Sequence, residues 1–402
     1  MWRWIAGRGF GHWIRVAVVV ALGLYASEAA REHHLWLWAD LHMYQWLSEL
    51  SPRPLKPRHT AIVLIDDDAF WKGPLAARIP LKRTYIARLV EAIDAGGADV
   101  IALDIDFRSA NPAGPARTHP DYEAETQELL KVLKAVATSR RLVLSRPVGA
   151  NASHETVANF SIYDDQHLCD DAPSPHHRLH CGYLELPRDI RMLPPSLFLA
   201  DGSYLPSFAV ATVQARRRQD PNDEFESRQR LRFGSYIPSD TFRKEAVFPS
   251  GQILAASREE RERKLGGKVV LVGGTWSELA YGRGSLVDLW DTPVGPIPGV
   301  FVHANYIEAL LDDRVYVPLP GWLEFGVELV ILGLCVLAFE VGRSTFRKAL
   351  AIAALCAALL LTSYFAFQNV GRVFNVFIPL VFLVAHAILE QVLEWRKVAL
   401  AT

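Results

Sequence analysis

The sequence carries no excess of charge of either sign. Its 402 residues include 43 lysines and arginines against 44 aspartates and glutamates, which gives a formal net charge of −1. Proteins that bind nucleic acid need a basic surface that neutralises phosphates. The charge balance therefore argues against nucleic acid as a partner.

Motifs for nucleophilic and nucleotide chemistry are also missing. Serine, histidine and aspartate are present, but no nucleophile elbow arranges them for catalysis. Residues 273–275 (Gly-Gly-Thr) follow an apolar run but lack the spacing and the lysine of a phosphate-binding loop. We therefore expect a tight turn there and no enzymatic activity. A metal-dependent enzyme at the aspartates described below is the third-ranked alternative.

Cysteine is scarce, with four in the chain. Cys335 and Cys356 lie in apolar runs, where a buried thiol serves packing. Cys169 and Cys181 lie in a polar insert, and a cysteine pair in an oxidising compartment normally forms a disulfide. The alternative is a metal site that also uses histidines of this insert. These are His154, His167, His176, His177 and His180.

Long hydrophobic runs are concentrated near the two ends of the chain. The four runs are residues 13–30, 321–341, 349–367 and 373–393. Each is long enough, or nearly so, to cross a bilayer as a helix, which needs about 20 apolar residues. The first run also fits a cleaved signal peptide. The sequence thus predicts about four transmembrane helices.

Basic residues predict the orientation of these helices. Arginines and lysines cluster at 343–348 and 396–397, and such residues mark the cytoplasmic side. The long middle segment then lies outside, in the periplasm or extracellular space of a bacterial inner membrane. The predicted parts are an anchor (1–31), a juxtamembrane helix and proline-rich linker (32–57), an external domain (58–320), and three transmembrane helices with a short tail (321–402).

The external domain is predicted to be an α/β sandwich. Residues 62–65 and 100–103 are continuous apolar runs typical of strands buried on both faces, and a helical pattern at 85–93 connects them. The later pattern predicts helices at 121–138, 208–217 and 299–311, and strands at 141–145 and 268–274. We expect a mixed, largely parallel sheet. Residues 151–195 show no periodicity and are expected to form a polar insert.

Aspartates follow the predicted strands, where open α/β sheets bind their ligands. The carboxylates concerned are Asp66, Asp68, Asp104, Asp106, Asp288 and Asp291. If they converge, they suit a polar ligand or a divalent cation such as calcium or magnesium, the only cofactor we expect. The alternative is that Asp66 and Asp104 cap helices or pair with Lys82, Arg83 and Arg108.

Two further polar residues stand in the last predicted helix. His303 and Asn305 would help line a ligand pocket if that helix begins near the sheet edge. The alternative is that His303 is a satisfied structural group.

Several motifs in the right order resemble the extracellular CHASE sensory domain of the second type. The first half carries VLID (63–66), PLKRTY (80–85) and GADVIALDIDF (97–107). The second half carries GKVVLVGGT (267–275), DTP (291–293), PGV (298–300), HAN (303–305) and the leucines 310–311. The resemblance covers about 58–320, and three following transmembrane helices fit the usual arrangement of the family.

This resemblance implies an external sensory module of a bacterial receptor. Such modules usually feed a cytoplasmic output domain, whereas here nine residues follow position 393. We therefore expect a ligand or protein partner to bind outside, and the transmembrane helices to pass the state to a separate signalling protein, with the bilayer and a second copy of the chain as further partners. The alternative is a structural or scaffold subunit of a membrane complex, without a small ligand.

Overall fold

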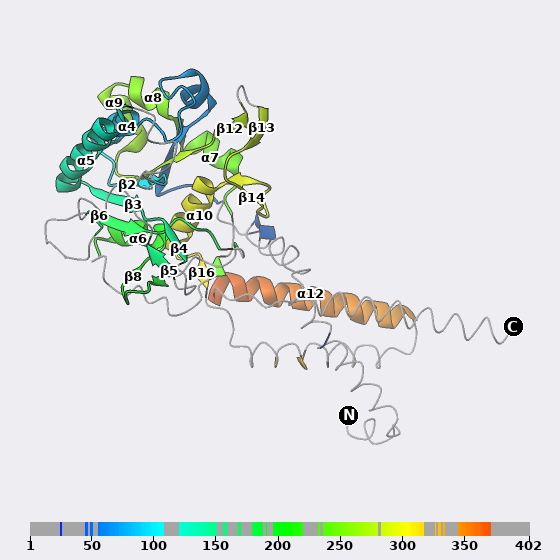
Figure 1. Ribbon diagram of the computed structural model, residues 1–402. Helices are drawn as coiled ribbons and strands as arrows, with labels where there is room; N and C mark the ends of the chain where they lie inside the picture. The colour runs from blue at the N-terminus through cyan, green and yellow to red at the C-terminus, as the bar shows by residue number, and fades with distance from the viewer. Residues whose placement is uncertain are drawn as a thin grey trace. The chain divides into compact units, whose positions relative to one another are not determined.

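Figure 1 shows a computed structural model of the chain. The residues that the structure describes are 25, 45–46, 49–50, 55–107, 120–150, 156–158, 168–169, 179–187, 190, 196–219, 232–233, 236–279, 283–316, 326, 329–330, 333 and 345–370. The chain divides into two compact units. One, the terminal unit, comprises Met1–Pro52 and Tyr316–Thr402; the other, the α/β unit, is Arg53–Val315.

A six-stranded sheet forms the centre of the α/β unit, with the strand order β10-β1-β11-β2-β3-β6. In that order the strands are Val247–Pro249, Thr60–Ile65, Val269–Gly274, Val100–Asp104, Arg141–Ser145 and Leu179–Gly182. Every pairing between them is parallel. The predicted α/β class is thereby confirmed.

The register of the central strands brings their carboxyl ends to one edge. β11 lies between β1 and β2, so that Leu64 pairs with Gly273 and Gly273 pairs with Asp104. The strands are apolar throughout because both faces are covered, and all six residues of β1 are buried. Parallel direction therefore gathers the polar residues that follow each strand.

Helices cover both faces of the sheet (Figure 1). On one face lie α4 (Arg83–Ala95), α5 (Tyr122–Ser139), α8 (Ser250–Ala255) and α9 (Arg258–Leu265), which share a core with alternate strand residues such as Val63 and Ile101. The other face carries α6 (Phe208–Arg217) and α10 (Gly299–Leu311), which pack on each other and on β1 and β3. The result is three layers.

Smaller elements complete the described part of the unit. The π-helix η1 is Asp68–Lys72 and α7 is Ser239–Glu245. Short strands also form antiparallel pairs outside the central sheet. β4 (Val148–Ala150) pairs with β5 (Thr156–Ala158), and β7 (Leu197–Phe198) pairs with β8 (Tyr204–Leu205). β12 (Ser277–Leu279) pairs with β13 (Arg283–Leu286), and β14 (Leu289–Trp290) pairs with β15 (Ile297–Pro298). β16 (Val315–Tyr316) pairs with β9 (Arg232–Phe233).

The edge strands were not predicted from the sequence. β6 lies within the segment 151–195, which was expected to lack regular structure, and β10 lies between the predicted helix at 208–217 and the predicted strand at 268–274. Both are short, and β10 ends in a proline, which only an edge strand accommodates readily. Strands of three or four residues give too little periodicity to recognise. The π-helix η1 likewise lies in a segment for which no helix was predicted.

The terminal unit contains α12 (Thr345–Val370), which covers the predicted helix at 349–367. Among the described residues, no helix was found to combine the length and the apolar character that a membrane crossing requires. The predicted spans 13–30 and 373–393, and most of 321–341, lie outside the described residues.

The predicted disulfide is present. Cys169 and Cys181 are bonded, with their Cα atoms 5.8 Å apart. Cys181 belongs to the edge strand β6, and Cys169 is buried in the core under the helices α4 and α5. The bond therefore ties a segment of the polar insert to the edge of the sheet, and it removes both thiols from any metal site.

We expect the double variant Cys169→Ser/Cys181→Ser to unfold more easily, because the bond closes a short loop. Chain-entropy arguments give a loss of roughly 3 kcal/mol in the free energy of unfolding, measurable by urea unfolding of the full chain in detergent. Cys356→Ser, which removes a free cysteine, is the matched control. Equal stability of the double variant and the control would contradict this role.

Candidate functional site

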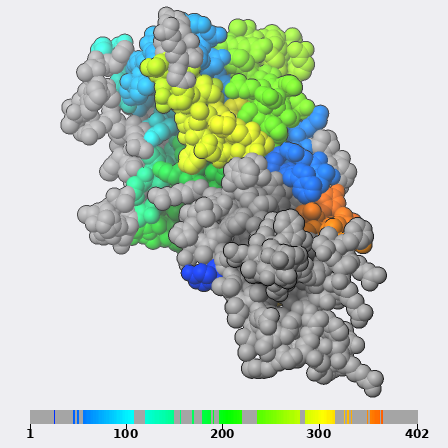
Figure 2. All heavy atoms as spheres, turned by 90° about the vertical axis from the view of Figure 1, so that its right-hand side faces the viewer, coloured from blue at the N-terminus to red at the C-terminus, as the bar shows by residue number. Residues whose placement is uncertain are grey.

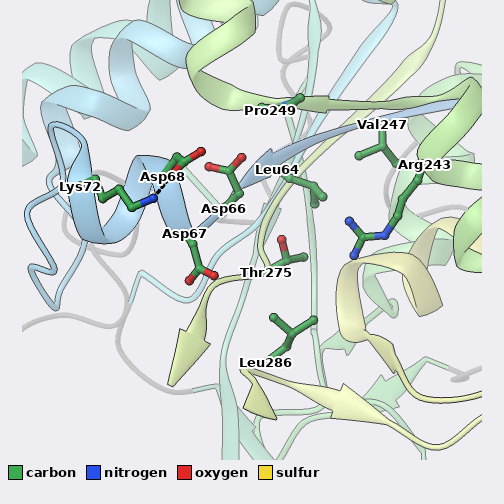
Figure 3. A pocket seen from close by; sticks show the side chains of 10 residues that line it. All are labelled: Leu64, Asp66, Asp67, Asp68, Lys72, Arg243, Val247, Pro249, Thr275 and Leu286. Atoms are coloured by element: carbon green, nitrogen blue, oxygen red, sulfur yellow. Dashed lines mark hydrogen bonds and ion pairs between the residues drawn. The ribbon is translucent and has the colours of Figure 1, made fainter. Parts of the chain in front are cut away.

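A cavity of about 480 Å³ lies at the carboxyl edge of the sheet. The residues that line it come from β1 and the segment after it, from α7 and β10, from the position after β11 and from β13. They are Leu64, Asp66, Asp67, Asp68, Lys72, Arg243, Val247, Pro249, Thr275 and Leu286 (Figure 3). We call it the strand-end cavity. On the face shown in Figure 2, the yellow segment around β13 adjoins the green segment of α7 to α9.

Aromatic packing connects two of the segments that contribute residues to the cavity. The rings of Phe70 and Trp276 are stacked with centroids 4.4 Å apart, and the indole nitrogen of Trp71 donates to the Ser277 carbonyl at 3.1 Å. These contacts hold η1 against the loop that follows β11. Gly274 permits this arrangement, because a Cβ there would lie 2.1 Å from the Trp276 ring.

Two of the three consecutive aspartates are engaged by neighbouring groups. Both carboxylate oxygens of Asp67 accept hydrogen bonds from Ser277, from the backbone nitrogen and from the hydroxyl, each at 2.8 Å. Asp68 pairs with Lys72 at 2.8 Å on the exposed side of η1. Asp67 therefore serves structure, and the charge of Asp68 is balanced locally.

Asp66 and Arg243 differ from these two. Asp66 accepts one hydrogen bond through Oδ1, from the Ala69 backbone nitrogen at 3.0 Å, and its Oδ2 has no partner among the described residues. Arg243 forms no ion pair within the described part of the chain. Its guanidinium carbon lies 5.7 Å from the ring centroid of Phe301, in the first turn of α10. Figure 3 shows Leu64 and Thr275 between the two charged groups.

The predicted site residues Asp104 and Asp288 lie together at the neighbouring strand end. Burial, and to a smaller extent the negative charge of Asp288, raise the pKa of Asp104 to about 8. Burial also raises the pKa of Asp288, while a hydrogen bond from the Trp290 indole at 2.8 Å lowers it. Asp104 is thus protonated at neutral pH, and a neutral carboxyl group is a poor ligand for a cation.

His303 and Asn305 belong to α10 and do not line the cavity. Both are buried. Asn305 accepts from the Ile237 backbone nitrogen at 2.6 Å and donates to the Phe301 carbonyl at 2.9 Å. Burial lowers the pKa of His303 to about 4, so its ring is neutral, and it packs edge-on against Phe208.

Of the residues predicted as a site, the structure therefore places Asp66 and Asp68 in the cavity lining. Asp106 and Asp291 are exposed and do not line it. The cavity also contains Lys72 and Arg243. Its mixed charge suits a ligand that carries both signs better than a bare cation.

A second group of polar residues lies at the opposite edge of the sheet. Ligand atoms of His59, Glu308 and Asp312 fall within 4.8 Å of one another. The buried Glu308 carboxylate accepts hydrogen bonds from the backbone nitrogens of Arg58, His59 and Thr60, at 3.1, 2.9 and 2.7 Å, and from the Thr60 hydroxyl at 2.7 Å.

Asp312 is engaged as well, since it pairs with His59 at 3.0 Å and accepts from Arg314 at 3.4 Å. Hydrogen-bond donors therefore already occupy the carboxylate oxygens that a metal ion would need. We interpret this group, the Glu308 clasp, as a structural connection between the end of α10 and the beginning of β1.

Sequence reasoning missed Arg243, Thr275 and Leu286 in the lining, and it missed Glu308. Arg243 and Leu286 reach the cavity from α7 and β13, short elements without a motif. Thr275 ends the segment 273–275, which was interpreted as a tight turn. Glu308 did carry a signal, because it is the one carboxylate in the apolar helix GVFVHANYIEALL.

We expect Asp104→Asn to change how stability depends on pH. The folded protein keeps a proton on Asp104 up to about pH 8, whereas the unfolded chain releases it near the ordinary value of 3.8. The higher proton affinity of Asp104 in the folded protein therefore adds to the free energy of unfolding. This stabilisation is present in full at low pH and is lost as the pH rises to about 8. His303 has the opposite effect below pH 6.5. Because its ring resists protonation in the folded protein, it lowers the free energy of unfolding as the pH falls.

Of these two groups, Asp104 is thus the one that makes the free energy of unfolding depend on pH between pH 6.5 and about 8. The free energy of unfolding of the wild type should fall there by at most about 1.4 kcal/mol per pH unit, measured by urea unfolding. Asp104→Asn should remove this slope, and the exposed Asp240→Asn should keep it. A slope unchanged in Asp104→Asn would refute the assignment.

The strand-end cavity, the parallel sheet and the sequence blocks can be compared with known proteins. The model of the CHASE2 domain matches residues 16–339, which includes the whole α/β unit. No curated protein and no solved structure matches the chain significantly. The family match spans more than half of the chain and confirms the resemblance inferred from the sequence. The chain belongs to the CHASE2 family of extracellular sensory domains.

Proposed function

We propose that this protein is a membrane-anchored sensor that binds a ligand outside the cytoplasm, at the strand-end cavity, and passes the bound state to a separate signalling protein. It has no catalytic role of its own. The sensory character of the CHASE2 family supports the first part of this proposal. The apolar runs and their flanking basic residues support anchoring in a bacterial inner membrane, with the α/β unit in the periplasm or extracellular space.

The observation that carries the proposal is the position of α10. Its first turn meets the carboxyl edge of the sheet, where Phe301 lies under Arg243 of the cavity and a Cβ on Gly273 would contact Val300 at 2.7 Å. Its last turn holds the beginning of β1 through Glu308. A helix of 13 residues spans about 20 Å, so α10 connects the two edges.

This connection gives the sensor a route for its signal. Beyond α10 the chain runs into Tyr316 and the predicted transmembrane segment at 321–341. A ligand that holds Arg243 in one position alters its packing on Phe301 and biases α10 toward one of two placements. The signal requires that the ligand binds the two states with different affinity.

Affinity capture of the full chain from bacterial membranes tests the output. We expect recovery of a kinase, a cyclase or another signalling enzyme, because the CHASE2 family is sensory and a sensor must pass its state to an enzyme that produces the response. A stoichiometric complex without any signalling enzyme would instead support a scaffold subunit and contradict the proposal. Capture with the variant Arg243→Gln, whose cavity is altered, serves as the comparison.

Replacement of Glu308 by glutamine tests the clasp. The new amide must place a donor where the carboxylate now accepts from backbone nitrogens, so we expect a loss of roughly 1–3 kcal/mol in the free energy of unfolding. Urea unfolding followed by circular dichroism measures this. Glu91→Gln changes an exposed glutamate on α4 in the same way and should leave stability unchanged. Equal stability of the two variants would remove the clasp from the proposed route.

A further inference from the structure

We propose that the strand-end cavity binds a small zwitterion, namely a free α-amino acid with an apolar side chain, held between Asp66 and Arg243. This inference rests on the proposed function, because it assigns the ligand class of the same sensory site.

The negative end of the site is Asp66. Its Oδ1 is fixed by the backbone nitrogen of Ala69 at 3.0 Å, which sets the orientation of the carboxylate. Oδ2 keeps its capacity to accept, since no described residue donates to it. An ammonium group is the ligand chemistry that such a carboxylate binds best, through a charge-assisted hydrogen bond.

The positive end is Arg243. Its contact with the face of Phe301 positions the guanidinium group without using its hydrogen-bond donors. A guanidinium group binds a carboxylate with two parallel hydrogen bonds. Asp66 and Arg243 line the same cavity and form no ion pair with each other among the described residues. A ligand with an ammonium and a carboxylate group would satisfy both.

The remaining lining fits the rest of an amino acid. Asp67 and Asp68 are engaged by Ser277 and Lys72, which leaves Asp66 and Arg243 as the charged groups that a ligand would meet. Leu64, Val247 and Leu286 supply apolar walls, and Thr275 contributes a hydroxyl group between the charged ends (Figure 3). A volume of about 480 Å³ falls in the range of small-molecule sites.

Isothermal titration calorimetry of the full chain in detergent micelles tests the ligand class. The probes are the free standard amino acids, with L-leucine as the reference for an apolar side chain. Isopentylamine is leucine without its carboxylate, and isocaproate is leucine without its amine. We expect L-leucine or a similar apolar amino acid to bind, and each singly charged analogue to bind roughly tenfold to 100-fold more weakly, as expected for one lost charged hydrogen bond.

Variants then assign the two ends. Asp66→Asn keeps an oxygen for the Ala69 nitrogen but loses the charge, and it should weaken amino-acid binding by roughly tenfold or more. Arg243→Gln should have a similar effect. Asp240→Asn and Lys244→Gln alter exposed charges on the same short helix α7 and should bind like the wild type. Unchanged melting temperatures without ligand exclude unfolding as the cause.

The outcomes separate this inference from the proposed function. If no amino acid binds, or if a singly charged analogue binds as tightly as its parent, the zwitterion assignment is overturned. Recovery of a signalling enzyme in the capture experiment would in that case still support a sensor with another ligand. Amino-acid binding without any signalling partner would keep the assignment and overturn the sensor.

Discussion

Four hydrogen bonds to the buried carboxylate of Glu308 fix helix α10 against the sheet, and much of the α/β unit depends on this placement. With the last turn held at the beginning of β1, the first turn meets the carboxyl edge of β11, where Gly273 leaves room for Val300. Phe301 then supports Arg243 at the cavity. One buried charge, satisfied entirely by hydrogen-bond donors, thus sets the geometry of a site at the opposite edge.

Parallel strands explain why the strand-end cavity and the chain connections occupy different edges. All six strands run in one direction, so the residues that follow them collect at one edge, and the residues that precede them collect at the other. The linker before β1 and the segment after α10 meet at the second edge. The proposed sensor therefore needs an element that crosses from the edge with the cavity to the edge with the chain connections, and α10 is such an element.

Much of this organisation could be predicted from residue patterns. The long apolar strands and the helix at 299–311 were predicted nearly to the residue, because continuous apolar runs and helical spacing are strong local signals. Asp66 was found because it directly follows a strand. Arg243 could not be found, since its place in the cavity depends on β10 pairing with β1 at the sheet edge, a long-range contact that three residues of strand do not reveal.

The position of β11 also constrains how the chain assembles. β1 and β2 are separated in the sheet by a strand that is synthesised much later, after α9. Until that strand arrives, β1 and β2 each expose a row of unpaired backbone groups, the condition under which strands pair with the wrong partner. Contacts over such long sequence separations are slow to form. The central sheet therefore closes late, and the emerging chain needs protection from aggregation during that interval.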